Sequence, residues 1–150
     1  MSSFFKKQLA FGQIYEKKLL NHIECDTYII KEGLFCDYDL KTYTNGVKTK
    51  YEVKADKFTY KTNNIVIEYM CYNKPSGISL TRADYYAYFV VKPYDLYDLY
   101  IIPVPKIKEL IDNGAYKRIL KGGDKMLSFM YVFDIEIFKE FKVFPEEKKC

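Results

Sequence analysis

The chain has 150 residues, of which 49% are hydrophobic and 29% charged, a composition typical of one folded globular domain, here residues 1–150. The net charge of +4 is mild and does not by itself point to a class of partner. No run approaches the about 20 apolar residues of a membrane-spanning helix, and the N-terminus has no apolar run typical of a secretory signal. We therefore expect an intracellular protein without a membrane partner.

Cysteine and histidine usage argues against a zinc centre. No two of the four cysteines form a C-x-x-C pair, and His22 is the single histidine. Free thiols in a reducing compartment are the expected state.

The first half of the chain predicts one helix followed by strands. Apolar residues recur at three- and four-residue steps over residues 11–23, which predicts an amphipathic helix. A short strand is expected at residues 27–30. Alternation of polar and apolar residues predicts a longer strand at residues 34–43, and the following Asn45-Gly46 is a strong signal for a two-residue hairpin turn.

The strand that returns from this turn is expected at residues 47–54, and a further strand at residues 65–69. Pro75-Ser76-Gly77 predicts a loop. Thr81 is then the expected N-cap of a short helix that carries Asp84.

Two more strands, at residues 89–91 and 99–102, are expected to be joined by a turn near Pro93. Pro105 and Asn113-Gly114 mark the start and the end of a helix.

The last part of the chain predicts a strand at residues 127–133 and a helix at residues 135–141, after a break at Gly122-Gly123. The tail at residues 146–149 is expected to fray. This order of elements predicts an α+β (mixed α/β) fold, in which an N-terminal helix precedes an antiparallel hairpin, and a central mixed sheet is flanked by helices.

The hairpin register brings charged residues together. Counting outward from Asn45-Gly46 places Asp39 opposite Glu52 and Asp37 opposite Lys54, and opposed residues share one face with Cβ atoms about 4.5–5.5 Å apart. Two opposed carboxylates repel each other, and a divalent cation would offset that repulsion. We interpret the cluster as a candidate Mg²⁺ site, and the alternative is the solvated polar face of an ordinary strand.

Two details of this site remain open. Asp37 is the alternative first carboxylate; Asp39 is preferred because it opposes Glu52 directly, and a one-residue bulge would change the count. Lys54, two residues after Glu52, points the same way along the strand, where it can orient a water or stabilise charge on a phosphate.

The hairpin carries a pattern that resembles the D…(D/E)xK signature of the PD-(D/E)XK nuclease superfamily. In this pattern Asp39 comes before the turn and Glu52-Val53-Lys54 after it. The resemblance extends over about residues 11–91 and is greatest to small members from phages and large DNA viruses. Tyr38 stands where the signature has proline. The segments that carry the resemblance are Tyr51-Glu52-Val53-Lys54-Ala55-Asp56, Asn64-Ile65-Val66-Ile67-Glu68-Tyr69, Lys74-Pro75-Ser76-Gly77-Ile78 and Thr81-Arg82-Ala83-Asp84-Tyr85-Tyr86.

The resemblance implies a restriction-endonuclease-like fold and a Mg²⁺-dependent DNA endonuclease in which Mn²⁺ can substitute. Asp39 and Glu52, helped by the carbonyl of Val53, would hold the metal, and Lys54 would position the attacking water. Glu16 matches an acidic residue that many members place beside the metal. DNA is the implied partner, and a homodimer is the arrangement of many members.

Four further residues are candidates for substrate binding: Glu68, Ser76, Thr81 and Arg82. Glu68 interrupts an apolar strand, and the other three surround an expected helix start, where backbone N–H groups can receive a phosphate. An ordinary turn and cap is the alternative for these three. For the whole chain, the alternatives are an inactive nuclease-fold module that binds DNA and a protein-interaction domain that uses the 16 tyrosines.

Overall fold

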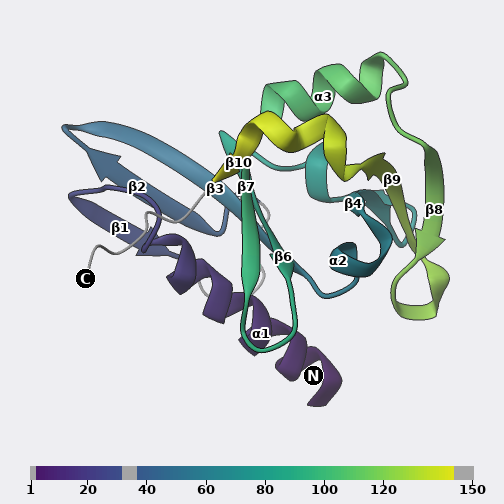
Figure 1. Ribbon diagram of the computed structural model, residues 1–150, viewed down its shortest axis with the longest axis horizontal. Helices are drawn as coiled ribbons and strands as arrows, with labels where there is room; N and C mark the ends of the chain where they lie inside the picture. Colours follow the sequence, from purple (N-terminus) through teal and green to yellow (C-terminus); the bar gives the residue numbers. More distant parts are fainter. Residues whose placement is uncertain (1–2, 32–36, 144–150) are drawn as a thin grey trace.

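The computed structural model describes residues 3–31 and 37–143, which form a mixed α and β structure with two sheets (Figure 1). The first sheet has six strands in the order β1-β2-β3-β6-β7-β10. Their bounds are β1 Thr27–Ile30, β2 Leu40–Thr44, β3 Val47–Asp56, β6 Tyr85–Val91, β7 Tyr97–Pro103 and β10 Lys142–Val143. All neighbours pair antiparallel except β3 and β6, which makes this a mixed sheet.

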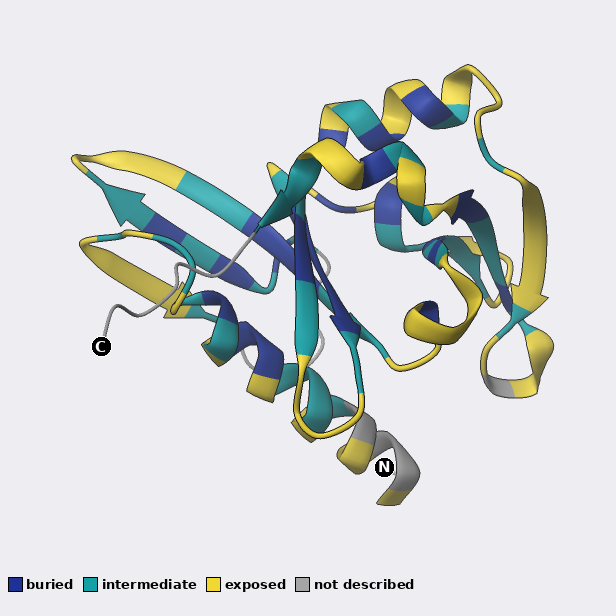
Figure 2. Ribbon diagram, viewed as in Figure 1, coloured by how far each residue is buried: buried dark blue, intermediate teal, exposed yellow. Residues whose placement is uncertain are grey.

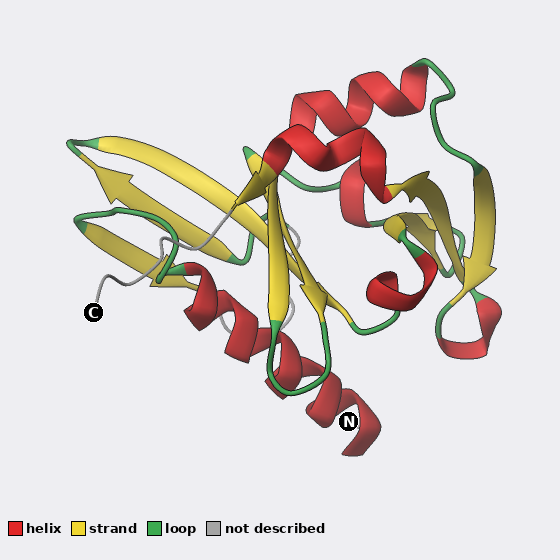
Figure 3. Ribbon diagram, viewed as in Figure 1, coloured by secondary structure: helices red, strands yellow, loops and turns green. Residues whose placement is uncertain are grey.

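The second sheet has four antiparallel strands in the order β5-β4-β9-β8. They are β4 Asn64–Cys71, β5 Lys74–Pro75, β8 Arg118–Gly122 and β9 Ser128–Asp134. The helices are α1 Ser3–Leu19, α2 Thr59–Thr62 and α3 Val104–Asp112, with the 3-10 helices η1 Gly77–Ser79, η2 Asp124–Met126 and η3 Ile135–Phe141 (Figure 3).

The core lies on both faces of the first sheet. Helix α1 covers one face, where Tyr15 and Leu19 pack with Leu40, Val53 and Phe89. The other face packs against the second sheet, α3 and η3. The buried side chains of that larger cluster include Ile65, Ile67, Tyr86, Tyr88, Ile102, Ile107, Phe133 and Phe138. Strand β6 is therefore buried along most of its length and β7 is buried at Leu99, Tyr100 and Ile102, whereas the tip of the β2–β3 hairpin is exposed (Figure 2).

One tyrosine hydroxyl joins the two sheets. The hydroxyl of Tyr88 donates to Asp56 Oδ2 at 2.7 Å, lies 3.3 Å from Thr59 Oγ1, and accepts the backbone N–H of Val66 at 3.3 Å. Burial, the largest cause, raises the pKa of Tyr88 far above its ordinary value, so the hydroxyl keeps its proton. This network fixes the end of β3 against β4.

Most predicted elements are confirmed, within shifted limits. The first helix, predicted at residues 11–23, begins earlier and ends earlier, at Ser3–Leu19, although Leu20 and Ile23 still pack against the core beyond its end. The final helix at residues 135–141 is a 3-10 helix. The expected strand residues 34–36 and the tail at 146–149 lie outside the described residues.

One part of the fold was missed by the sequence, and one predicted element is wrong. The expected central mixed sheet is present, but a second, four-stranded antiparallel sheet, which includes β8, was not predicted. The helix expected from Thr81 does not form. Residues 81–84 instead bond to distant backbone, since Arg82 N–H donates to Asp37 O and Asp84 N–H to Lys50 O, and β6 follows directly.

Candidate functional site

The candidate site lies where the β2–β3 hairpin opens. The predicted register is confirmed from Thr44↔Val47 to Leu40↔Tyr51, and Asn45 and Gly46 have the positive φ angles of a two-residue turn. The ladder then ends. The predicted pairing of Asp39 with Glu52 is therefore wrong.

The Asp39 carboxylate takes the place of a backbone partner. Its Oδ2 accepts the N–H of Val53 at 2.8 Å, while the Asp39 N–H donates to Tyr51 O at 2.9 Å. Strand β3 pairs with β6 on one edge and with β2 on the other. The bond from Asp39 satisfies the backbone N–H of Val53 at a point where β2 no longer pairs with β3. The carboxylate is thereby fixed beside the Glu52-Val53-Lys54 segment.

Glu52 is buried, with 8% of its surface exposed, and it has two polar contacts. Its Oε1 lies 3.4 Å from Lys54 Nζ, and its Oε2 accepts from Thr81 Oγ1 at 3.3 Å. Burial is the largest cause of its raised pKa, which Asp39 raises further and Lys54 lowers. The pKa of Asp39 is also raised, mainly by burial, against the opposing effect of Lys54.

Helix α1 brings Glu16 to the same place. Glu16 is 8% exposed, and its Oε2 has no hydrogen-bond partner among the described residues. Its pKa is raised to about 7, first by burial and then by the negative charges of Asp39 and Glu52. Three acidic side chains from α1, the segment before β2, and β3 therefore lie within electrostatic reach of one another.

Lys54 is the cation of the cluster, and its side chain is 44% exposed. Burial lowers its pKa, but the carboxylates of Glu52, Asp39 and Glu68 outweigh that effect and hold the pKa above its ordinary value. The ammonium group is thus charged at neutral pH and accessible from solvent.

The donor set fits a hard divalent cation that keeps several waters. Across residues 3–31 and 37–143, no group of three or more His, Cys, Asp or Glu side chains is arranged to hold a metal ion. Mg²⁺, however, is commonly held by one or two carboxylates together with waters and phosphate oxygens. Asp39 and Glu52 supply such a pair, and the unpartnered Oε2 of Glu16 is a buried acceptor that a cation or its water would satisfy.

Asp37 does not take the place that its predicted register gave it. Its carbonyl accepts from the Arg82 N–H at 2.9 Å and lies 3.3 Å from Thr81 Oγ1, so Asp37 is bound to the loop before β6 rather than opposite Lys54. Asp39 is the carboxylate that contacts the Glu52-Val53-Lys54 segment.

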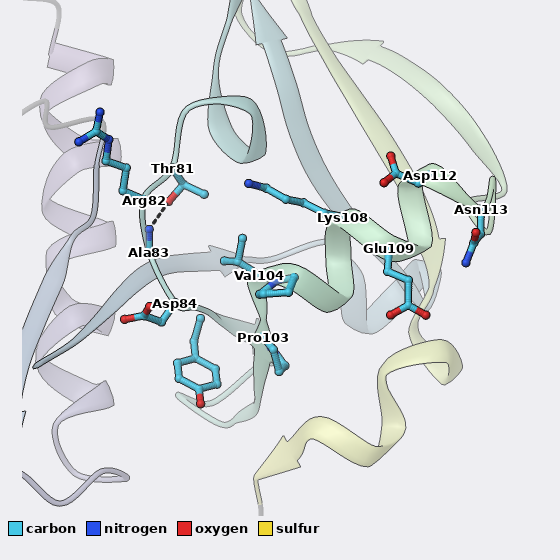
Figure 4. A pocket seen from close by; sticks show the side chains of 12 residues that line it. Thr81, Arg82, Ala83, Asp84, Pro103, Val104, Lys108, Glu109, Asp112 and Asn113 are labelled. Carbon is cyan, nitrogen blue, oxygen red and sulfur yellow. Dashed lines mark hydrogen bonds between the residues drawn. The ribbon is translucent and has the colours of Figure 1, made fainter. Parts of the chain in front are cut away.

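Two predicted substrate residues line an open pocket beside the site. Thr81 and Arg82 lie on one side of a cavity of about 820 Å³, and Lys108, Glu109 and Asp112 of α3 lie on the other (Figure 4). Because Thr81 also bonds to Glu52, this pocket adjoins the carboxylates.

Glu68 and Ser76 belong to the second sheet and its following turn. Glu68 on β4 acts on the site through its charge, which helps to hold the pKa of Lys54 up. Ser76 has a buried Oγ without a hydrogen-bond partner among the described residues. Next to it, Gly77 has φ +51° and lies so close to the Glu68 carbonyl that a Cβ there would be 2.2 Å from the oxygen. This turn thus fixes the loop that carries Thr81.

Sequence reasoning missed Tyr86. The parallel register places it beside Glu52, and its buried hydroxyl has no hydrogen-bond partner among the described residues. Burial, and then Glu52, Asp39 and Glu68, raise the pKa of Tyr86 well above its ordinary value. The only sequence signal would have been the β3–β6 pairing, which connects residues 34 apart and leaves no local pattern.

Comparisons of the chain with protein-family models, curated proteins and solved structures give no match. No helix in the described part of the chain is long and apolar enough to cross a membrane. The assignment of function therefore depends on the geometry and chemistry of the site.

Proposed function

We propose that the protein is a Mg²⁺-dependent phosphodiesterase that cuts DNA, a member of the PD-(D/E)XK superfamily with a restriction-endonuclease-like fold. One observation supports this most: Glu16, Asp39, Glu52 and Lys54, the residues of the resemblance, converge at the point where β2 leaves β3. An ordinary solvated strand face would not bury Glu16 and Glu52 and leave Glu16 Oε2 without a hydrogen-bond partner among the described residues.

Asp39 and Glu52 would hold the cation, with Glu16 beside it. A bound Mg²⁺ would neutralise charge on the phosphate and make a nucleophile available from water near neutral pH. The hydrogen bonds from Val53 N–H and Thr81 Oγ1 keep the two carboxylates oriented before any substrate binds. Such preorganisation lowers the cost of reaching the transition state.

Lys54 would act on the reacting phosphate. Its ammonium group donates hydrogen bonds only, so in this role it orients the attacking water and stabilises negative charge on the phosphate oxygens. Its place beside Glu52, with 44% of the side chain exposed, allows both contacts.

The test is a cleavage assay on supercoiled, linear, single-stranded and four-way-junction DNA, with Mg²⁺, Mn²⁺ or EDTA. Asp39→Asn, Glu52→Gln and Lys54→Gln each remove one charge from the site. Glu140→Gln and Lys139→Gln remove the same charges from exposed positions on η3 and serve as matched controls. We expect metal-dependent cutting that the first three variants reduce by at least about 100-fold, the scale of losing one preorganised group, and that the controls retain.

Other outcomes would indicate other functions. DNA binding without cutting, on every substrate and with every metal, would indicate a nuclease-fold binding module. Neither binding nor cutting would favour the protein-interaction domain and would overturn the proposal.

A further inference from the structure

Three lysines surround one tyrosine on the β1–β2–β3 part of the first sheet. The Nζ atoms of Lys31, Lys41 and Lys50 lie 5.9, 5.3 and 5.4 Å from the ring centroid of Tyr38. Lys31 directly follows β1, Lys41 is on β2, and Lys50 is on β3. We call these three residues the lysine cluster.

Lys41 and Lys50 of the lysine cluster share a sheet face with Glu52. Lys41 and Lys50 are directly opposed in the hairpin ladder. Side chains alternate along a strand, so Lys50 points to the same side as Glu52 and lies about 7 Å from it along β3. Lys41 lies two residues from Asp39 along the chain, at the start of β2. The nearest lysine of the cluster on β3, Lys50, is therefore the next side chain on the same face as the candidate metal ligand Glu52.

Opposed like charges need a compensating partner. Two directly opposed cations destabilise a strand pair, and the Tyr38 ring offsets this only in part. Among the described residues, neither Lys41 nor Lys50 forms an ion pair with a carboxylate. Hydrogen bonds to Tyr38 and then Tyr43 raise the pKa of Lys41, so it remains charged at neutral pH.

We infer that the lysine cluster binds backbone phosphates of the DNA strand next to the phosphate being cut. The cluster would guide that strand along β1–β2–β3, which extends from the body of the molecule in Figure 1, towards the carboxylates. Such contacts are independent of base sequence and fix the register of the strand. This inference rests on the proposed function and adds the path of the substrate to it.

The pocket between Thr81 and α3 is the weaker candidate for this path. Its lining contains three acidic side chains, Asp84, Glu109 and Asp112, against the two cations Arg82 and Lys108. A polyanion would meet net negative charge there, whereas the lysine cluster presents three cations around one aromatic ring.

The test measures DNA binding separately from cutting. Affinity for a fluorescein-labelled duplex is measured by anisotropy in EDTA at several salt concentrations, for the wild type and for Lys41→Gln/Lys50→Gln. The control is Lys61→Gln/Lys121→Gln, which removes two exposed lysines that also lie over aromatic rings, those of Tyr60 and Phe129. Both double variants lose the same charge.

We expect the slope of log affinity against log salt to become shallower by about 1.8 in Lys41→Gln/Lys50→Gln, at about 0.9 for each phosphate that a lysine no longer neutralises. The control should keep the wild-type slope. Lys41→Arg/Lys50→Arg should restore it, which shows that charge and not folding is responsible. In the cleavage assay, removal of the two cluster lysines should raise KM with little change in kcat.

Equal slopes in the two double variants would overturn the inference, as would a wild type that does not bind the duplex. The proposed function fails separately. If the slope changes as expected but no substrate is cut with any metal, the lysine cluster binds DNA and the phosphodiesterase proposal is wrong. If cutting occurs and the slopes are equal, the proposed function stands and the DNA follows another path.

Discussion

Glu16 shows how the fold changes the chemistry of one side chain. In the unfolded chain its carboxyl would titrate near its ordinary value of 4.5, whereas burial and the neighbouring acids raise its pKa to about 7 in the folded protein. Between these values the unfolded state loses its proton first. The contribution of Glu16 to stability is therefore present below about pH 4.5 and is lost as the pH rises to about 7.

We predict that in EDTA the melting temperature of the wild type falls between pH 5 and pH 7.5, and that the melting temperature of Glu16→Gln falls less over the same range. Thermal unfolding followed by circular dichroism at a series of pH values measures this difference. Glu140→Gln, which changes an exposed acid, should follow the wild type. An identical pH dependence for Glu16→Gln would show that Glu16 titrates normally.

The Tyr88 hydroxyl has a structural role that can be measured. Tyr88→Phe leaves Asp56 and the Val66 N–H without this partner, and leaving buried polar groups unpaired costs about 1–3 kcal/mol. We expect urea denaturation to show a loss of that size. Tyr94→Phe removes a hydroxyl from a side chain that is 95% exposed and should leave the free energy of unfolding unchanged.

Part of the charged cluster could be predicted from the sequence, but its exact contacts could not. Counting from Asn45-Gly46 selected Asp39, Glu52 and Lys54, because a two-residue turn fixes the register. The count went wrong at Asp39, where a side-chain bond to Val53 replaces the ladder. Alternation alone contains no signal for the point at which two strands separate.

At the scale of elements, the turn at Gly77 connects the second sheet to the site. It packs against the Glu68 carbonyl on one side and leads to Thr81, which bonds to Glu52, on the other. A glycine is required here both for its positive φ and for the close approach.

We predict that Gly77→Ala destabilises the protein more than Gly46→Ala. Both positions have positive φ, which costs a non-glycine residue about 1–2 kcal/mol. At Gly46 nothing lies within 4 Å of an added Cβ, so only that cost applies, whereas Gly77→Ala adds a clash with backbone. Chemical denaturation of the two variants gives the comparison, and equal losses would mean that the turn moves away from β4 without cost.

Local elements were predictable where short-range patterns determine them. The hairpin turn, β1, β4, β9 and α3 each have a local signal in the sequence. The Thr81 helix was predicted from local capping chemistry and was wrong, because the backbone of residues 81–84 bonds to Asp37 and Lys50, which are more than 30 residues away. The division into two sheets likewise depends on long-range pairing.

For the whole molecule, binding of a metal ion to the candidate site should raise the free energy of unfolding. A ligand that binds only the folded state at 100 times its Kd adds about 2.7 kcal/mol. We expect Mg²⁺ or Mn²⁺ to raise the melting temperature of the wild type and of Glu140→Gln, and to have little effect on Asp39→Asn/Glu52→Gln. Differential scanning fluorimetry over a metal titration measures this without DNA. A similar shift in all three proteins would place the metal elsewhere.

The parallel pairing of β3 with β6 has a consequence for synthesis of the protein. The neighbours of Glu52 in this ladder are 34 residues further along the chain, and β4, which supports the same face, pairs with β9 at residues 128–134. Contacts between distant segments form slowly, and a chain emerging from the ribosome cannot make them until the later segment is available. The candidate site would therefore acquire its final geometry only after β9 has been made, so a chain that ends before residue 128 would lack the support of β4.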